Sequence, residues 1–310
     1  MKSDVLSIMA NRKTKSRVEK CAAAVLTCCA FISILAVVAI TGYMIMEGTP
    51  ALFKVGIKEI LFSTVWEPTA SDPQYGILYI ILTSIVGTSL AILLGVPIGI
   101  LSAVCLAEIC PKQLKGILKS AIELLAGIPS VVYGLLGILI INPAMYNLEK
   151  LLFSGDPNHQ FTGGSNLLSA VLVLTIMILP TLINITETSL EAVPKDYRTS
   201  SLALGATQIQ TIFKVTLPAA KNGIASAIVL GVGRAIGEAM AILLVAGNAV
   251  NAPYPFNSVR FLTTAIVSEM SYSSGTHRQV LFTIGLVLFV FIMIINIILN
   301  YIITRGDKNE

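Results

Sequence analysis

The chain has 310 residues, of which 55% are hydrophobic and only 12% are charged, and its formal net charge is +4. An ordinary soluble domain carries about 25% charged residues, so this composition excludes that class and indicates an integral membrane protein.

The first part of the chain predicts a basic tail followed by a membrane-spanning helix. Residues 1–20 are polar and basic, whereas 21–46 contain no charged residue. A cleaved signal peptide is the alternative, but the polar leader is long and the apolar run is longer than a typical signal-peptide core. We therefore expect an uncleaved first transmembrane helix over 21–46 and an external segment over 47–75.

Residues 76–304 hold the remaining apolar runs and predict a helical membrane core. Each run is long enough for the roughly 20 residues that cross a bilayer as a helix. Together with the first helix they predict an all-α, polytopic membrane protein with six transmembrane helices. The five later spans cover about 76–104, 121–142, 165–187, 223–247 and 279–304.

The second span carries three glycines, Gly87, Gly95 and Gly99, at spacings that place small residues along the helix. Small residues let helix backbones approach each other closely. We expect this helix to pack tightly against another one.

The five cysteines give no sign of a disulfide framework, because all of them fall in predicted spans or near the ends of spans. Cys105 and Cys110 have no His or further Cys at metal-ligand spacing. We interpret both as small packing residues and expect neither a metal nor another cofactor. The full set is Cys21, Cys28, Cys29, Cys105 and Cys110.

The third span is interrupted by Gly127-Ile128-Pro129, where an unstrained helix cannot keep all of its hydrogen bonds. Irregular backbone within a membrane is tolerated where it is packed in protein or lines a polar cavity. Two interpretations stay open: a packing kink without a ligand, and a part of a substrate pathway that includes Ser130 and Tyr133.

The loop at 188–222 predicts two short helices separated by a glycine. Asp196 follows Pro194, and a negative charge suits the first turn of a helix. Gly205 is the residue type that most easily closes a helix in the left-handed conformation. A second amphipathic run then ends at Leu217-Pro218.

The fifth span contains the two charges that are hardest to explain in a membrane, Arg234 and Glu238. A charge at the bilayer centre costs roughly 2.5–3.5 kcal/mol, so it normally faces a cavity or a partner. On a continuous helix these residues share one face and could neutralise each other. The functional alternative is that Arg234 meets an oxyanion in a pathway, since its planar fork fits phosphate, and that Glu238 holds Arg234 in place.

Most Lys and Arg residues fall in segments that lie inside if the N-terminus is inside. Positive segments stay on the cytoplasmic side, so we expect both termini, including the tail at 305–310, and the 188–222 loop to be cytoplasmic. The positive net charge thus reflects topology and does not indicate a nucleic-acid partner.

The spacing from Gly205 to Leu217-Pro218 resembles the cytoplasmic loop motif of the permeases of ABC importers. In that motif E-A-A and three residues precede a glycine, and nine residues, I, one residue and L-P follow it; this chain departs at the E-A-A position. The resemblance implies a type I importer fold with the permease core at 76–304, and a coupling helix that sits in a groove of a separate ATPase. An ordinary interfacial loop is the alternative. The implied coupling residues are Thr199, Ser200, Ser201, Ala203, Gly205, Val215, Leu217 and Pro218.

The run ELLAGIPSVVYGLLG at 123–137 is similar to the third-span signature of the phosphate-importer branch. The resemblance to its C-type permease subunit implies four partners: a homologous A-type permease, two copies of a cytoplasmic ATPase, an external phosphate-binding protein, and phosphate. In that branch the fifth-span Arg and Glu, here Arg234 and Glu238, look like required residues. An A-type subunit or a sulfate or molybdate permease remains an alternative.

Two other classes fit less well. The chain has no G-x-x-x-x-G-K-[ST] sequence, so ATP would be bound by another chain and this chain would be a transport subunit, not an enzyme. An intramembrane enzyme would need catalytic groups at depth, but the only histidines, His159 and His277, lie in predicted external segments. A secondary transporter usually has inverted repeats and more spans.

Overall fold

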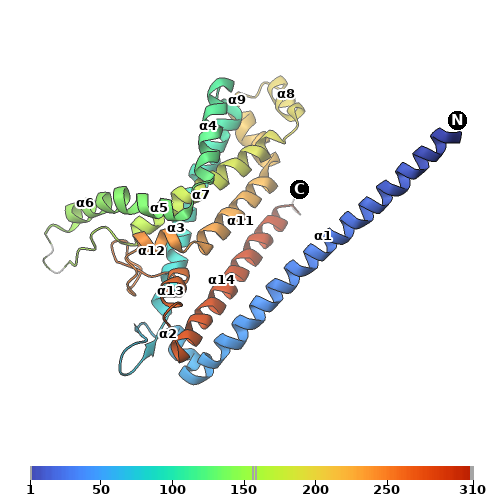
Figure 1. The fold of residues 1–310 in the computed structure, drawn as a ribbon. Coiled ribbons are helices and arrows are strands. Elements are labelled where there is room, and N and C mark those ends of the chain that lie inside the picture. Colours follow the sequence, from blue (N-terminus) through green and yellow to red (C-terminus); the bar gives the residue numbers. More distant parts are fainter. Residues whose placement is uncertain (1, 156, 158, 308–310) are drawn as a thin grey trace.

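The computed structural model describes residues 2–155, 157 and 159–307, and these are mostly helical (Figure 1). The predicted all-α membrane class is confirmed. One small hairpin pairs β1 with β2 in antiparallel register, with Trp66 opposite Tyr75. The elements are α1 Lys2–Ala51, α2 Ile57–Phe62, β1 Trp66–Glu67, β2 Gln74–Tyr75, α3 Leu78–Val104, α4 Lys112–Ala126, α5 Ser130–Leu136, α6 Asn142–Phe153, α7 Leu167–Glu191, α8 Lys195–Ala203, α9 Gln208–Thr211, α10 Leu217–Ala219, α11 Lys221–Gly237, α12 Met240–Val245, α13 Leu262–Glu269 and α14 Gly275–Asp307, with π-helical turns at Leu52–Gly56, Cys105–Ile109, Gly137–Ile141 and Ile212–Thr216.

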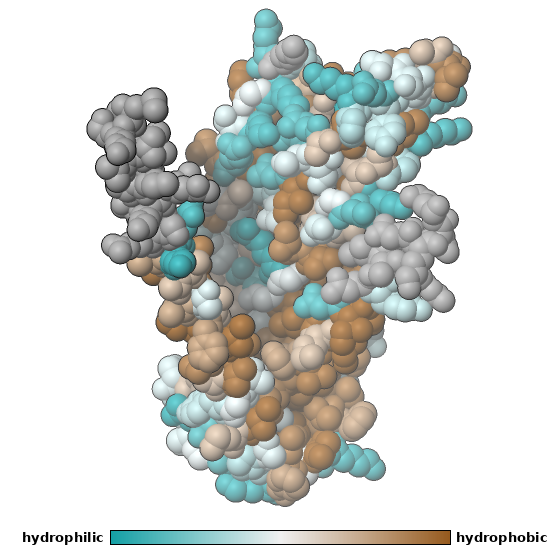
Figure 2. Space-filling model, turned by 90° about the vertical axis from the view of Figure 1, so that its right-hand side faces the viewer, coloured by the Kyte–Doolittle hydropathy of each residue, from teal (hydrophilic) through white to brown (hydrophobic). Residues whose placement is uncertain are grey.

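Five helical stretches of the described chain are long and apolar enough to cross a membrane. Figure 2 shows hydrophobic side chains gathered over the middle of the molecule and hydrophilic ones at its upper and lower ends. This is the surface expected of a multi-pass membrane protein, whose lipid-facing belt is apolar. The five stretches are Glu19–Phe62, Leu78–Ile109, Ser130–Phe153, Leu167–Glu191 and Gly275–Leu299.

The predicted span at 223–247 is wrong as a single helix. It consists of α11, which ends at Gly237, and the short helix α12, which begins at Met240. At 1.5 Å per residue, α11 alone covers about 25 Å, which is less than the roughly 30 Å of a bilayer core. Two helices that meet at a break therefore replace the single helix predicted here.

The predicted span at 121–142 is shifted. The helix breaks at Gly127-Ile128-Pro129 as expected, but the apolar stretch then continues from Ser130 to Phe153, through residues assigned to an external loop. In Figure 1, α5 and α6 run crosswise to α4. Pro143 does not stop α6, because a proline in the first turn of a helix removes no internal hydrogen bond.

The helix α7 is the centre of the fold and packs against α3, α11 and α4. Its partner α3 brings glycines to the contact: a Cβ at Gly95 would lie 2.7 Å from Ile178 Cδ1, and one at Gly99 would lie 2.9 Å from Leu182 Cβ. Close packing through the small residues of the second span is thus confirmed. Such contacts leave little room for larger side chains.

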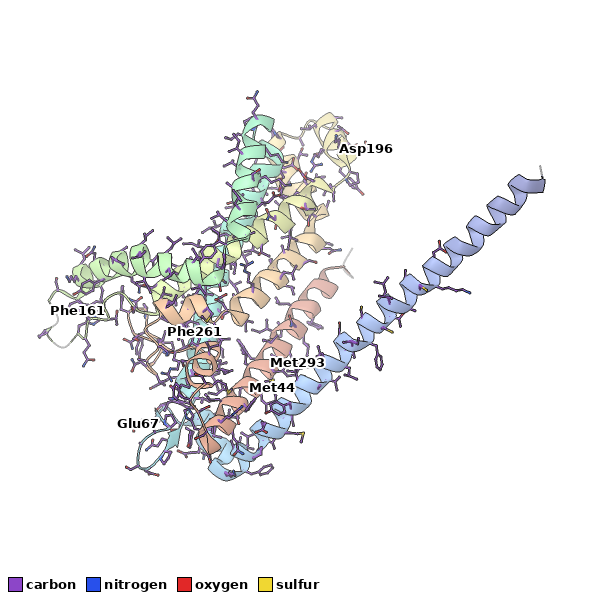
Figure 3. All side chains as sticks on the ribbon, viewed as in Figure 1. Met44, Glu67, Phe161, Asp196, Phe261 and Met293 are labelled. Carbon is purple, nitrogen blue, oxygen red and sulfur yellow. The ribbon has the colours of Figure 1, made fainter. Side chains whose placement is uncertain are left out.

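The two ends of the molecule carry different structures. Figure 3 places Asp196, in α8, at one end and Glu67, in the hairpin, at the opposite end. We refer to these as the α8 end and the hairpin end. α1 contacts α14 near the hairpin end, where the rings of Tyr43 and Phe282 are 5.5 Å apart, and its N-terminal part stands apart from the other helices (Figure 1).

Candidate functional site

The α8 end carries a helix, a glycine break and a second helix, as the sequence predicts. α8 ends at Ala203, and Gly205 has a φ of +88°, a conformation that residues with a Cβ rarely adopt. The backbone N–H of Gly205 donates to the carbonyl of Leu202, and that of Ala206 donates to the carbonyl of Ser201. These hydrogen bonds satisfy carbonyls left free at the helix end.

The following helix begins with a capping box. The Thr207 hydroxyl accepts from the N–H of Gln210, and the Gln210 side chain accepts from the N–H of Thr207. The pattern T-x-x-Q at 207–210 signals such a start in the sequence. The Ser201 and Thr211 hydroxyls, 2.9 Å apart, then join α8 to α9.

This segment, which we call the α8–α9 knob (residues 195–211), presents apolar side chains to its surroundings. Leu204 is 89% exposed, and Ile209 on α9 and Phe213 in the turn after the knob are also largely exposed, whereas Ile212 is buried. The amphipathic run predicted here is therefore split between the core and the surface. Of the remaining predicted coupling residues, Thr199, Ser200, Ala203 and Pro218 are exposed, and Val215 and Leu217 are half-buried.

Arg198 fixes the knob to the membrane core. Its guanidinium donates to the Glu108 carboxylate, to the Leu190 carbonyl at 2.8 Å and to the Val193 carbonyl at 3.0 Å. Arg198 suits this role because its fork carries several donors in a fixed plane. Sequence reasoning missed it, since no pattern joins residue 198 to residue 108.

A second set of charges links α4 to the end of α7. The carboxylate of Glu187 is fully buried and lies 3.1 Å from Lys119 Nζ and 3.5 Å from Lys115 Nζ. Lys115 also donates to Glu191, and this hydrogen bond raises the pKa of Lys115 above its ordinary value. The segment that joins α7 to the knob is therefore held from two sides: Glu108 binds Arg198, and α4 binds the end of α7.

Arg234 and Glu238 do not form the ion pair that the sequence left open as one of two alternatives. The helix stops at Gly237, and Glu238 has an extended backbone with φ −74° and ψ 132°. Its carboxylate accepts from the N–H of Ala241 at 3.0 Å and so caps α12. Among the ion pairs of the described residues none joins Arg234 to Glu238, because their i, i+4 geometry is lost at the break.

The break has two further polar neighbours that the sequence analysis missed. Arg234 Nη1 donates to the Thr181 hydroxyl at 3.3 Å, and the Thr263 hydroxyl donates to the Glu238 carbonyl at 2.7 Å. On the same helix a Cβ at Gly233 or Gly237 would meet no atom within 4 Å. The Arg234 region of α11 thus has an open flank beside a half-buried guanidinium.

Ser130 and Tyr133 lie at the other break. Ser130 is half-buried at the start of α5, and the hydroxyl of Tyr133 donates to the carbonyl of Leu125 at 2.7 Å, which satisfies a backbone group near the interruption. A cavity of about 240 Å³ beside Tyr133 is lined by apolar side chains. α5 packs directly against α12, so both breaks belong to one region of the membrane core.

The chain is similar to membrane proteins of known transport systems. A family model described as the inner membrane component of binding-protein-dependent transport systems matches residues 95–308. The Bacillus subtilis protein "Probable ABC transporter permease protein YqgH" is 39% identical over 91% of this chain and 89% of its own length. The phosphate transport system permease protein PstC of Pasteurella multocida is 33% identical over 81% of each chain.

Solved structures of similar fold are ABC transporters. A chain of a bacterial alginate ABC transporter, in complex with a periplasmic protein bound to an alginate pentasaccharide, has a TM-score of 0.59 and 16% identity and covers 89% of this chain and 93% of that one. A chain of the MetNI methionine ABC transporter in an inward-facing conformation has a TM-score of 0.52 and 20% identity and covers 72% and 93%. At these identities the likeness concerns the fold.

Proposed function

The chain belongs to the family of inner membrane components of binding-protein-dependent transport systems, and from this premise we propose that it is the membrane-spanning permease subunit of an ATP-driven importer of inorganic phosphate. Membership makes it an ABC transporter permease. Phosphate as the substrate is supported by the relatives named PstC, among them that of Mesorhizobium japonicum, which is 34% identical over 80% of this chain.

The observation that carries this proposal is the α8–α9 knob with its exposed Leu204. An apolar side chain at the tip of a rigid, anchored helical segment is well suited to a groove on another protein. The chain has no phosphate-binding loop of its own for ATP, so a partner ATPase would occupy that position, as two copies in the cytoplasm. The knob, the 188–222 loop and both termini are then cytoplasmic, and the hairpin end faces outward.

The substrate pathway in this proposal passes Arg234 and the open flank of α11. Because Glu238 caps α12 and does not pair with Arg234, the guanidinium keeps donors for an oxyanion, which it can bind through two parallel hydrogen bonds. Glu238, Ser130 and Tyr133 complete the proposed pathway residues. A homologous A-type permease would cover the open flank, and an external phosphate-binding protein would deliver the substrate at the hairpin end.

Transport would proceed by alternating access. When the ATPases close on ATP they draw the knobs together, which opens the outward side to phosphate, and hydrolysis returns the inward-facing state. The chain can change direction at the break between α11 and α12, because no hydrogen bonds of a continuous helix have to be lost there.

Uptake by the reconstituted complex tests this proposal. The chain is co-expressed with an A-type permease and an ABC ATPase and placed in proteoliposomes that enclose ATP, with a phosphate-binding protein outside. We expect accumulation of labelled phosphate that requires ATP and is not matched by sulfate or molybdate. Accumulation without an ATPase, or a preference for sulfate, would contradict the proposal.

A further inference from the structure

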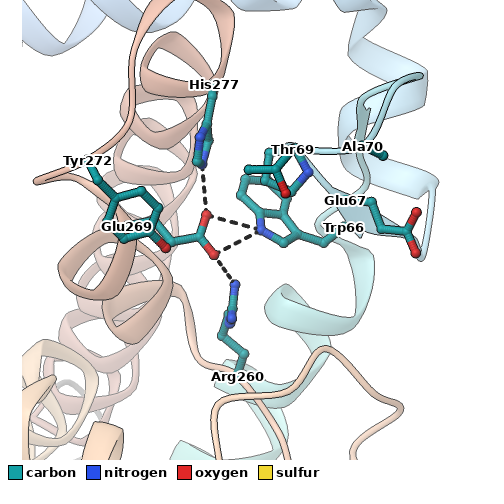
Figure 4. Close-up of a pocket in the computed structure, with 9 residues that line it drawn as sticks. Trp66, Glu67, Thr69, Ala70, Arg260, Glu269, Tyr272 and His277 are labelled. Carbon is teal, nitrogen blue, oxygen red and sulfur yellow. Dashed lines mark hydrogen bonds and ion pairs between the residues drawn. The ribbon is translucent and has the colours of Figure 1, made fainter.

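Glu269 is the centre of a polar cluster at the hairpin end that joins distant parts of the chain (Figure 4). Its carboxylate accepts from Trp66 Nε1 at 3.2 Å and from the Arg260 guanidinium, and lies 2.8 Å from His277 Nε2. The carboxylate is 8% exposed, so these contacts replace most of its water. A cavity of about 360 Å³ opens beside the cluster and is lined by the same side chains and by the exposed Tyr272.

The cluster brings together a hairpin strand, the approach to α13, and the start of α14. Trp66 belongs to β1, Arg260 precedes α13 and also donates to the Asn248 carbonyl at 2.9 Å, and His277 lies in the first turn of α14. Loss of part of the water around the Tyr272 phenol, with the nearby Glu269 charge, raises the pKa of that phenol.

α13 connects this cluster to the broken membrane helix. Glu269 is the last residue of α13, and near its other end the Thr263 hydroxyl donates to the Glu238 carbonyl at 2.7 Å. The two residues are separated by about 9 Å along the helix axis at 1.5 Å per residue. The hairpin end and the α11–α12 break are therefore linked by one short helix.

The start of α13 is also hydrogen-bonded to its neighbours. The N–H of Leu262 donates to the Ser84 hydroxyl of α3 at 2.8 Å, and the N–H of Phe261 donates to the Thr264 hydroxyl at 2.9 Å. Leu262 and Ala265 are buried in the core that includes α14. A short helix with both ends tied moves as a unit, because close packing transmits displacement.

We propose that Glu269 and Thr263 are positioning residues for Glu238, and that α13 transmits a change at the hairpin-end cavity to the α11–α12 break. This inference rests on the proposed function in one respect, since the external binding protein is the partner that would act on the cavity. A protein docked over the hairpin moves Trp66 relative to Arg260 and His277, and Glu269 follows the donors that remain. Thr263 then moves with α13 and changes the position of the Glu238 carbonyl.

The test measures the environment of the break directly. The thiol introduced by Ala239→Cys, in a chain whose native cysteines are replaced by serine, is reacted with a maleimide in the purified complex without ATP or phosphate. We expect Glu269→Gln and Thr263→Val each to change the reaction rate by about five-fold or more. Thr263→Ser keeps the hydroxyl, and Glu59→Gln removes an exposed charge of α2 outside the cluster, so both should stay within about two-fold of the parent.

Each outcome decides the inference. Equal rates in all variants, a change in only one of Glu269→Gln and Thr263→Val, or the same change in Glu59→Gln overturns it. If Glu269→Gln does not assemble, His277→Gln removes one neighbour of the carboxylate and should shift the rate in the same direction. Because the assay contains no substrate, a failure of phosphate uptake leaves its result intact, and normal uptake with unchanged thiol rates would reject the α13 link alone.

Discussion

The α8–α9 knob and the α11–α12 segment are both pairs of helices with a break, yet the two breaks are held by different means. In the knob the break is local: Gly205 at φ +88° and the box of Thr207 and Gln210 lie within a few residues of one another. In the membrane helix the residue at the break, Glu238, has an ordinary φ, and one of its hydrogen bonds comes from the distant Thr263.

This difference follows from the surroundings of each break. The knob is surrounded by solvent, so its free backbone groups must be satisfied by neighbouring residues or by water. At the second break Glu238 is half-buried, and its polar groups bond to α12 and α13, which lie nearby in space. The first break therefore gives the knob a fixed shape that suits docking. The second break can change its conformation when the helices that contact it move.

The largest effect is expected when the charge of Arg234, beside the second break, is removed. Arg234→Gln should lower ATP-driven phosphate uptake at least about 10-fold, because a hydrogen bond to a charged group contributes about 1.5–3 kcal/mol. The complex should still assemble, since among the described residues the side chain of Arg234 bonds to the neutral Thr181 hydroxyl and to no carboxylate. Uptake of labelled phosphate and co-purification with the partner subunits measure both.

Arg234→Lys is the matched control for charge without the planar fork, and it should retain part of the activity. If Arg234→Gln transports normally, Arg234 is a structural residue and the pathway must lie elsewhere.

Breaks that a single residue type determines could be predicted from the sequence, whereas a break that depends on distant contacts could not. Gly205 was predicted because a single residue type determines its conformation, and Gly127-Ile128-Pro129 because Pro129 forbids a continuous helix. The stop at Gly237 was missed because neither Gly237 nor Glu238 rules out a helix by itself. It forms where the Glu238 carboxylate caps α12 and Thr263 contacts the Glu238 carbonyl, and that second partner is set by tertiary packing.

Anchoring residues were out of reach for a related reason. Arg198 was visible as a cytoplasmic charge, but its partners Glu108 and Leu190 come from two other helical segments. The pattern of apolar runs placed most membrane helices, whereas the end of α6 was missed because Asn142 and Pro143 resemble the start of a loop. Composition therefore predicted the class and the helices, and tertiary contacts decided where the helices break.

A smaller effect is expected when a side chain is added at Gly205, the left-handed residue of the first break. Gly205→Val should reduce uptake and ATPase stimulation by roughly 5- to 30-fold, since a left-handed residue with a Cβ costs about 1–2 kcal/mol and a β-branched one is at the upper end. A Cβ at Gly205 would meet no atom within 4 Å, so the effect arises from the backbone and not from a clash.

Gly116→Val provides the control for Gly205→Val. Gly116 lies inside α4, where an added Cβ also meets no atom within 4 Å, but its backbone is helical. It should leave coupling within about two-fold of the parent, because helix propensities of Gly and Val differ by only a few tenths of a kcal/mol. Equal losses in the two variants would show that the left-handed turn has no special part in coupling.

The smallest effect is expected from a change that only reports where each end lies. Leu204→Cys, in a chain without other cysteines, should react with a membrane-impermeant maleimide in inside-out vesicles and not in intact cells, since Leu204 is 89% exposed at the predicted cytoplasmic end. Asp72→Cys, in the turn of the hairpin, should show the reverse. Both substitutions leave the hydrogen bonds of the two breaks unchanged, but Leu204→Cys shortens the side chain proposed to dock, so the side of labelling is the readout and uptake is not. Labelling of both positions from the same side would place the knob and the hairpin on one face of the membrane, and the distinction between a docking break and a responsive break would then lose its topological basis.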